Sequence, residues 1–251
     1  MNKRLVSRTT KVTDLPAELL EQMFRLMGRH YRQVRREVFD RDLEDKDWVI
    51  LLHAPGSGGL VGFSTLKRFE HRYLGQRLRI VFSGDTIIEP SHWGSLELPL
   101  SFGRLMLSIQ AEEPATPLYW MLISKGFRTY RFMPVFFREF YPRHDARTPD
   151  WEAGLIDDLA GSRFPGAYQR DRGVLSFNGT SQVLRPELEN VPDQRRQNDP
   201  HIRFFHDRNP GHDSGDELVC LARFHRDNLI DFINRRLDQE PERPPIPVPL
   251  I

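Results

Sequence analysis

The chain has 251 residues and a formal net charge of +1, with 39% hydrophobic and 28% charged residues. This composition is that of a globular protein long enough to bury a sizeable core, and a charge near zero favours neither nucleic acid nor a membrane surface as a partner. The single cysteine, Cys220, excludes an internal disulfide and a thiolate metal cluster.

No apolar run reaches the ~20 residues that a membrane-spanning helix needs. The N-terminal segment MNKRLVSRTT has basic residues but no apolar stretch behind them, which is not the pattern of a secretory signal. The cytoplasm is therefore the expected location.

The first part of the chain predicts a strand followed by helices. Residues 5–12 form the strand, and Asp14 caps the next helix, with Pro16 in its first turn. A second helical segment is expected over residues 30–43. Strands over residues 47–54, 60–74 and 77–90, joined by turns that contain glycine, then form an antiparallel meander.

A strand–helix–strand unit follows the meander. After the strand at 77–90 and the loop at 91–95, apolar residues recur with the helical period from Leu98 to Ile109. Residues 117–124 form the next strand. Two strands joined by a crossover helix predict a parallel pair, and the loop before the helix is the expected ligand site, because free amides at a helix start attract anions.

The C-terminal part is less regular. Residues 127–141 carry seven aromatic side chains and predict a helix that Pro134 kinks or divides. The region 142–199 predicts long loops with a short helix at 151–159 and a short strand at 173–177. The density of rings over 127–141 indicates core, with an apolar channel for a long acyl chain as the functional alternative.

Three segments are expected overall. Residues 1–145 form the main body of the fold, and residues 146–239 are an extension that adds a late strand (216–224) and a helix (226–237) to the same domain. Residues 240–251 are a proline-rich tail.

The element order and two local sequences resemble the GNAT superfamily of acyl-CoA-dependent N-acyltransferases. The segment ISKGF, residues 123–127, is similar to the one that follows the fifth strand of that superfamily, and SHWGSL, residues 91–96, stands where the superfamily has its pyrophosphate-binding loop. The loop departs from the superfamily pattern, since Ser91 replaces a basic or amide residue and Leu96 a small one, while Gly94 is kept. The resemblance implies an α+β fold with a mixed, mostly antiparallel central sheet and helices on both faces.

The resemblance also implies a function, which is acyl transfer from a thioester donor to an amine of a small molecule or peptide. The donor is acyl-CoA or the phosphopantetheine of an acyl-carrier protein, and no metal is expected. The thioester arm then lies between the fourth and fifth strands, against the backbone of the fourth. The residues expected to hold the donor are Ile87, Ile88, Trp93, Gly94, Ser95 and Leu96.

Amide formation needs a base for the amine and benefits from an acid for the leaving thiolate. Glu89 and His92, at the end of the strand and in the next loop, are candidates for the base, and Asp85 is a third. Tyr130 falls where the superfamily often has an acid for the thiolate. Each has a structural alternative, which is solvation for Glu89, packing against Trp93 for His92, and core packing for Tyr130.

Other charged and polar residues have both a structural and a functional interpretation. An arginine-rich segment is either a solvated helix face or a docking surface for an acidic acyl-carrier protein; its members are Arg32, Arg35, Arg36 and Arg41. The spacings among His201, His206 and His212 fit no metal motif. Cys220 lies in an apolar strand, where an inert buried thiol is expected.

The main alternative to an enzyme is a binding or scaffold protein that keeps the fold and has lost the chemistry. Nucleic-acid binding through the arginine-rich segment ranks last, because that segment lacks interleaved aromatic residues.

Overall fold

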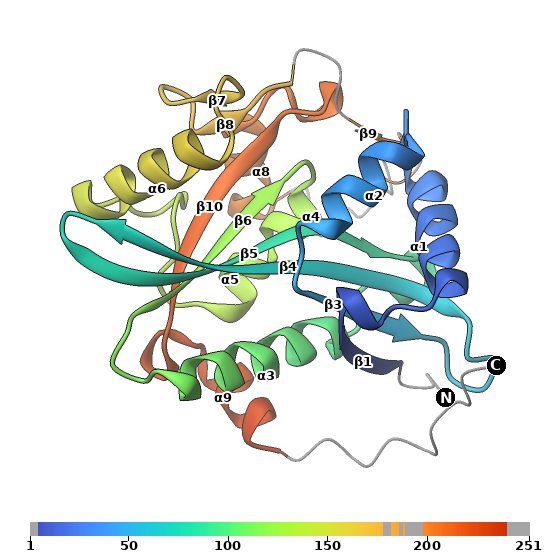
Figure 1. Cartoon of the computed structure of the whole chain (residues 1–251). Coiled ribbons are helices and arrows are strands. Elements are labelled where there is room, and N and C mark those ends of the chain that lie inside the picture. The colour runs from blue at the N-terminus through green and yellow to red at the C-terminus, as the bar shows by residue number, and fades with distance from the viewer. Residues whose placement is uncertain (1–4, 178–181, 186–187, 189–197, 240–251) are drawn as a thin grey trace.

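The computed structural model describes residues 5–177, 182–185, 188 and 198–239. Its centre is an eight-stranded sheet with the strand order β1-β3-β4-β5-β6-β10-β8-β7, beside a small two-stranded sheet of β2 and β9 (Figure 1). The strands are β1 (Val6–Lys11), β2 (Tyr31–Arg32), β3 (Trp48–His53), β4 (Leu60–Tyr73), β5 (Gln76–Ile88), β6 (Leu118–Ser124), β7 (Tyr168–Gln169), β8 (Val174–Leu175), β9 (Val183–Leu184) and β10 (Glu217–Phe224).

The described α-helices differ widely in length, and the longest is the crossover between β5 and β6. They are α1 (Ala17–His30), α2 (Arg36–Glu44), α3 (Glu97–Glu112), α4 (Phe127–Tyr130), α5 (Phe132–Phe136), α6 (Asp150–Arg163), α8 (Pro200–Arg208) and α9 (Asp231–Asp238). None of the described helices combines the length and the apolar character that crossing a bilayer requires.

The expected α+β class and the mixed sheet are confirmed. Among the described strand pairs, β5 and β6 run parallel and the others run antiparallel. The meander β3–β4–β5, the crossover α3 and the parallel strand β6 follow one another as the resemblance to the GNAT superfamily implies, and β10 pairs with the free edge of β6.

Helices cover both faces of the sheet (Figure 1). Alternate residues of a strand point to opposite faces, so Ile50 and Leu52 of β3 pack with α3, while Val49 and Leu51 pack with α1 and α2. Along β5, Val81 joins the α3 side and Phe82 the α6 side. The sheet therefore separates an α3 face from an α1–α2–α6 face, and any slot through the sheet connects the two.

Two expectations for the N-terminal region are wrong. Asp14 lies in a short 3-10 turn, and Pro16 is the residue before the first turn of α1, with no side-chain cap. The expected helix over residues 30–43 begins only at Arg36, because Tyr31–Arg32 pair with β9 and Gln33 takes a positive φ of 61°.

The aromatic segment also differs from the expected long helix. It forms α4 and α5, which part at Arg131, and Pro134 lies inside α5 instead of dividing the helix. After Phe136 the chain becomes extended, because Phe137 bridges to Leu229 and Tyr141 bridges to Leu221 at the sheet.

The later elements are found near their expected places with different ends. The helix expected at 151–159 is α6 and is longer, the strand at 173–177 shortens to β8, and the strand at 216–224 is β10. The last helix begins at Asp231, after a 3-10 turn. The proline-rich tail, 240–251, lies outside the described residues.

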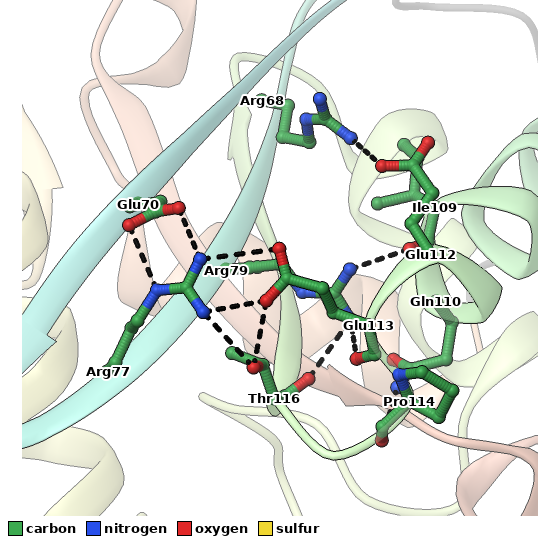
Figure 2. A network of polar contacts seen from close by, with 10 residues as sticks. All are labelled: Arg68, Glu70, Arg77, Arg79, Ile109, Gln110, Glu112, Glu113, Pro114 and Thr116. Carbon is green, nitrogen blue, oxygen red and sulfur yellow. Dashed lines mark hydrogen bonds and ion pairs between the residues drawn. The ribbon is translucent and has the colours of Figure 1, made fainter.

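A buried arginine fixes the far end of α3 (Figure 2). Arg79 of β5 is only 3% exposed and donates to the carbonyls of Ile109 at 2.6 Å, Glu113 at 2.6 Å and Thr116 at 3.1 Å. These carbonyls lie at the C-terminus of α3 and in the turn after it, where a helix leaves carbonyls without an intrahelical partner. The contact therefore ties the orientation of α3 to β5.

Candidate active site

The parallel strands β5 and β6 part at one end, and this opening defines the candidate site. They pair from Arg79–Leu118 to Ser83–Leu122 only, although β5 continues to Ile88. The pairing of β5 with β4 shifts between Ser64 and Leu66, where two residues of β5 stand opposite one of β4. Such a bulge bends a strand and increases its twist, which explains why β5 leaves β6 at this point.

Part of the β5 backbone faces the opening. The Glu89 N–H donates to the Val61 carbonyl of the β4 side at 2.8 Å. Hydrogen-bonding direction alternates along an antiparallel strand, so Ile87 also faces β4, while Thr86 and Ile88 face the slot left by β6. The Ile88 carbonyl is already engaged, since it accepts from Trp93 Nε1 at 2.8 Å.

A cavity of about 820 Å³ occupies this opening. All six residues expected to hold the donor line it, namely Ile87, Ile88, Trp93, Gly94, Ser95 and Leu96. Residues of α2, of the segment after β6 and of the end of α6 complete its wall. The cavity therefore reaches both faces of the sheet.

Asp85, within the bulge, is the acidic group of β5 that lines the cavity. Its side chain is partly buried, and no hydrogen bond or ion pair to its carboxyl is found among the described residues. Burial and the nearby Asp42 carboxylate raise the pKa of Asp85 from 3.8 to about 7, against the opposing effect of Lys125 and Lys46. A carboxyl group with a pKa near neutrality is suited to accept and return a proton at physiological pH.

A buried charge cluster lies close to Asp85. Lys125 Nζ is 3.2 Å from Glu217 Oε1, and their side chains are 15% and 10% exposed. The same Nζ lies 5.5 Å from the centroid of the Tyr31 ring, which the pairing of β2 with β9 holds in place. Burial acts to lower the pKa of Lys125, but Glu217, Tyr31 and Asp85 outweigh it and the pKa is raised. Lys125 therefore stays a cation beside the cavity.

Glu89 and His92 are not among the residues that line the cavity. The Glu89 carboxylate pairs with Arg29 of α1 at 2.6 Å. His92 lies in the 3-10 turn Pro90–His92, and its backbone N–H donates to the Glu89 carbonyl at 2.9 Å. Both stand beside the end of β5, outside the opening that contains Asp85.

Tyr130 is also outside the cavity lining. It is 0% exposed, its hydroxyl donates to the Pro142 carbonyl at 3.1 Å, and burial raises its pKa far above the usual range. Its ring packs against Phe140 and Phe205. This environment is that of a core tyrosine with a satisfied hydroxyl.

Four of the described histidines lie in two pairs. His206 Nδ1 lies 3.0 Å from His212 Nε2, and the rings of His144 and His201 are 4.4 Å apart. No group of three or more metal-binding side chains occurs in the part of the chain that the structure describes. Cys220 is fully buried, and burial raises the pKa of its thiol far above the usual range.

Sequence reasoning missed Lys125, Glu217 and Tyr31 as members of the site. Lys125 lies within the ISKGF segment, and Glu217 begins the strand that pairs with β6. A charged residue at the end of each of two neighbouring strands is the signal that would have placed them together. Tyr31 carries no such signal, because the sequence predicts a helix there.

No protein-family model and no curated protein matches the sequence, but solved structures are similar to its fold. Among solved structures, a conserved protein of unknown function from Enterococcus faecalis, described as a probable N-acyltransferase, matches at 18% identity with a TM-score of 0.39. The match covers 63% of this chain and only 43% of that protein.

Two further solved structures are similar over comparable lengths. An acetyltransferase from Trypanosoma brucei matches at 15% identity and a TM-score of 0.38, over 58% of this chain and 99% of its own. A GNAT family N-acetyltransferase from Escherichia coli, solved in complex with CoA, matches at 17% identity and a TM-score of 0.39, over 59% of this chain and 77% of its own.

Proposed function

We propose that this protein transfers an acyl group from a thioester donor to an amine. The observation that carries the proposal is the slot where β5 leaves β6, with Asp85 in its wall. The slot connects the two faces of the sheet, so donor and acceptor can approach from opposite sides and meet beside that carboxylate. Holding two reactants in this way removes much of the entropic cost of their reaction.

In the proposed reaction the Asp85 carboxylate takes a proton from the acceptor amine. The amine nitrogen attacks the thioester carbonyl carbon, a C–N bond forms, and the C–S bond then breaks. The thiolate takes up a proton and leaves as a thiol. The Ile88 N–H, which faces the slot, is positioned to stabilise the oxyanion.

We assign the base to Asp85 in preference to Glu89 and His92, the two first candidates from the sequence. Glu89 is held by Arg29, and neither residue lines the cavity. We give Tyr130 a structural role, because its hydroxyl is committed to Pro142 inside the core. A water molecule or the protonated Asp85 then supplies the proton of the leaving thiol.

The donor is acyl-CoA or an acyl-carrier protein, which present the same pantetheine arm. The arm is proposed to lie against Thr86 and Ile88, with Trp93 and Leu96 beside it. The acceptor is an amine of a small molecule or a peptide. Arg35 and Arg41 of the arginine-rich segment line the cavity, whereas Arg36 is paired with Asp40, so the first two are the candidates for contact with a carrier protein.

The test is release of free thiol from acetyl-CoA and from a long-chain acyl-CoA, with a panel of primary amines. We expect Asp85→Asn to lower kcat by about a hundredfold or more, the usual contribution of a general base. The kcat/KM of the wild type should fall as the pH is lowered through about 7, because the base is then protonated. Full activity of Asp85→Asn would contradict the assignment.

The alternative function is a binding protein without turnover. The start of α3 favours it, because Pro99 removes one of the amides that bind a donor phosphate in the resembled superfamily. Calorimetric titration separates the two readings. Binding of a thioester without thiol release, for every amine tried, would favour the binding protein.

A further inference from the structure

We infer that the acceptor amine also carries an oxyanion, a carboxylate or a phosphate, and that the side chains of Arg35 and Arg41 bind it. The inference rests on the proposed function, since it names the class of amine that the same cavity accepts. It assigns to these two arginines a role that does not depend on whether the donor is free or carried by a protein.

Most charged groups in the cavity wall already have a partner of opposite charge. These pairs are Lys125 with Glu217, Arg131 with Asp199, Arg163 with Asp45, and Asp42 with Lys46. Arg128 is engaged as well, because its Nη1 donates to the Leu188 carbonyl at 2.6 Å. A charged substrate would have to displace one of these partners in order to bind at any of them.

Arg35 and Arg41 differ from these groups. Both line the cavity with exposed side chains, and no hydrogen bond or ion pair of either guanidinium is found among the described residues. Arg36 shows the contrast, since Asp40 and Glu21 each hold it at 2.8 Å. A solvated guanidinium keeps its five N–H donors, in the planar arrangement that matches a carboxylate or a phosphate. These two cations can therefore bind an oxyanion without losing another partner.

Helix α2 aligns the two arginines along one side of the cavity. Arg35 directly precedes the helix, and Val38, Arg41 and Asp42 follow at the three- and four-residue spacings that place side chains on one helix face. All four line the cavity. At 1.5 Å per residue, Arg35 and Arg41 are about 9 Å apart along the helix axis. Burial and the Asp42 carboxylate raise the pKa of Asp85, so this side of α2 lies within electrostatic range of the proposed base.

The place of α2 in the fold assigns the two arginines to the acceptor. Helix α2 packs on the α1–α2–α6 face of the sheet through Phe39 and Leu43. The loop that is proposed to hold the donor leads into α3, and its Leu96 packs with the α3 face. Donor and acceptor approach from opposite faces in the proposed reaction, so the acceptor is the substrate that passes α2.

An amine that bears an oxyanion matches both ends of this half of the cavity. Its nitrogen can reach Asp85 while its oxyanion is bound by the guanidinium groups of Arg35 and Arg41. A second cationic group on the acceptor would instead meet two arginines for which the described residues provide no counter-charge, and like charges disfavour a substrate. The arginines therefore select the acceptor by the charge that it carries besides the amine.

The experiment measures kcat/KM for pairs of acceptors that differ in the oxyanion, with acetyl-CoA as the donor. The pairs are β-alanine with β-alaninamide, 6-aminohexanoate with 6-aminohexanamide, and O-phosphoethanolamine with ethanolamine. We expect the wild type to favour the charged member of at least one pair by about tenfold or more, the effect of a charge-assisted hydrogen bond. A preference within the carboxylate pairs identifies a carboxylate, and one confined to O-phosphoethanolamine identifies a phosphate. Either result supports the inference.

Arginine variants test which side chains are responsible. Arg35→Gln and Arg41→Gln should each lower the preference, and the double variant should remove most of it, with a rise in KM for the charged acceptor. Arg32→Gln is the matched control, because Arg32 is exposed and is not among the residues that line the cavity, and it should leave the preference intact. Free acetyl-CoA is the donor throughout, so contact with a carrier protein cannot produce this pattern.

The inference and the proposed function fail in different ways. Equal or lower kcat/KM for the charged member of every pair on the wild type, or an equal loss for both members in the double variant, would overturn the inference and leave the proposed function standing. Thiol release with other primary amines and with none of these acceptors would do the same. No thiol release with any amine would remove the proposed function as well.

Discussion

Asp85 is a carboxyl group that the bulge of β5 shields from solvent and turns toward the cavity. Its pKa in the folded protein, about 7, lies above the ordinary value of 3.8, so the folded state binds the proton more tightly than the unfolded state. The stability contributed by this group is thus fully present below pH ~4 and is lost as the pH rises toward ~7. The negative charge that the proposed base needs therefore opposes folding at neutral pH.

Replacing this carboxyl should therefore stabilise the protein in a pH-dependent way. Asp85→Asn, which resembles the protonated form, should raise the free energy of unfolding by roughly 1–2 kcal/mol at pH 8 and by less at pH 5, as measured by urea denaturation. Asp171→Asn, at an exposed turn, serves as the control and should show no such difference. A gain that is equal at both pH values would mean that charge burial is not the cause.

The ion pair of Lys125 and Glu217 should set the pH at which the proposed base works. Lys125 lowers the pKa of Asp85 and Glu217 raises it. The midpoint of the pH dependence of kcat/KM should therefore move up in Lys125→Met and down in Glu217→Gln, each by about half a unit or more. Movement of both midpoints in one direction would show that the variants act by distorting the site.

At the residue scale, the sequence predicted which residues of β5 and the following loop line the cavity, but not the ion pairs around it. The sequence gives Asp85 only as a third candidate, because it lies on the same strand as Glu89, four residues earlier. The sequence could not predict that Asp85 is a better candidate for the base than Glu89. The reason is that Glu89 pairs with Arg29, sixty positions away along the chain. Contacts of this kind leave no periodic pattern.

At the scale of elements, the bulge in β5 depends on a glycine. A Cβ added at Gly84 would lie 2.8 Å from Thr65 Oγ1 and 2.9 Å from Lys46 Cε. Lys46 is held there, because its Nζ pairs with Asp42 at 2.9 Å and its side chain is only 1% exposed. The close packing of these groups keeps β5 bent away from β6.

Gly84→Ala should consequently destabilise the fold by ~1–3 kcal/mol, the typical effect of overpacking, and should lower kcat by displacing Asp85. Gly161→Ala is the matched control. Gly161 lies in α6, and an added Cβ meets nothing within 4 Å, so alanine there should stabilise by about 0.5–1 kcal/mol. Thermal unfolding of both variants measures the contrast, and a neutral Gly84→Ala would show that the bulge does not need glycine.

The other end of β5 offers a test of how α3 is held (Figure 2). Arg79→Met removes the donor to three carbonyls near the helix end, and should cost about 2–4 kcal/mol in unfolding free energy. Arg77→Gln is the control, since its ion pairs with Glu70 and Glu113 are solvated and should contribute less than ~1 kcal/mol. Comparable losses in both variants would contradict the capping role of Arg79.

The elements that the sequence predicted well are those with a periodic or continuous apolar pattern. The meander, α3, β6 and β10 have alternating, helical or continuous apolar patterns that local physics fixes. The prediction of a helix over the whole aromatic segment is wrong, because Phe137 and Tyr141 pair with Leu229 and Leu221 instead. The predicted start of the helix at residue 30 is wrong for the same reason, because Tyr31 pairs with Leu184.

Over the whole molecule, the two parts of the sheet, the meander and the β6–β10 pair, are joined along a short ladder. β5 pairs with β6 through five residue pairs, from Arg79–Leu118 to Ser83–Leu122. Apolar residues pack across this junction on both faces, with α3 on one and α6 on the other. A pantetheine arm in the slot would extend the contact between the two parts, so donor binding should stabilise the entire fold.

Thermal stabilisation by the donor, measured together with thiol release, distinguishes an enzyme from a binding protein. At a donor concentration one hundred times Kd, binding adds ~2.7 kcal/mol to the unfolding free energy, which raises the thermal midpoint of a chain of this size by roughly 5–10 °C. Asp85→Asn should keep this shift with acetyl-CoA and lose thiol release, because the role proposed for the carboxylate is to move a proton and not to hold the donor. A variant that lost both would show that Asp85 contributes to binding, and the base would then have to be sought among the other groups around the slot.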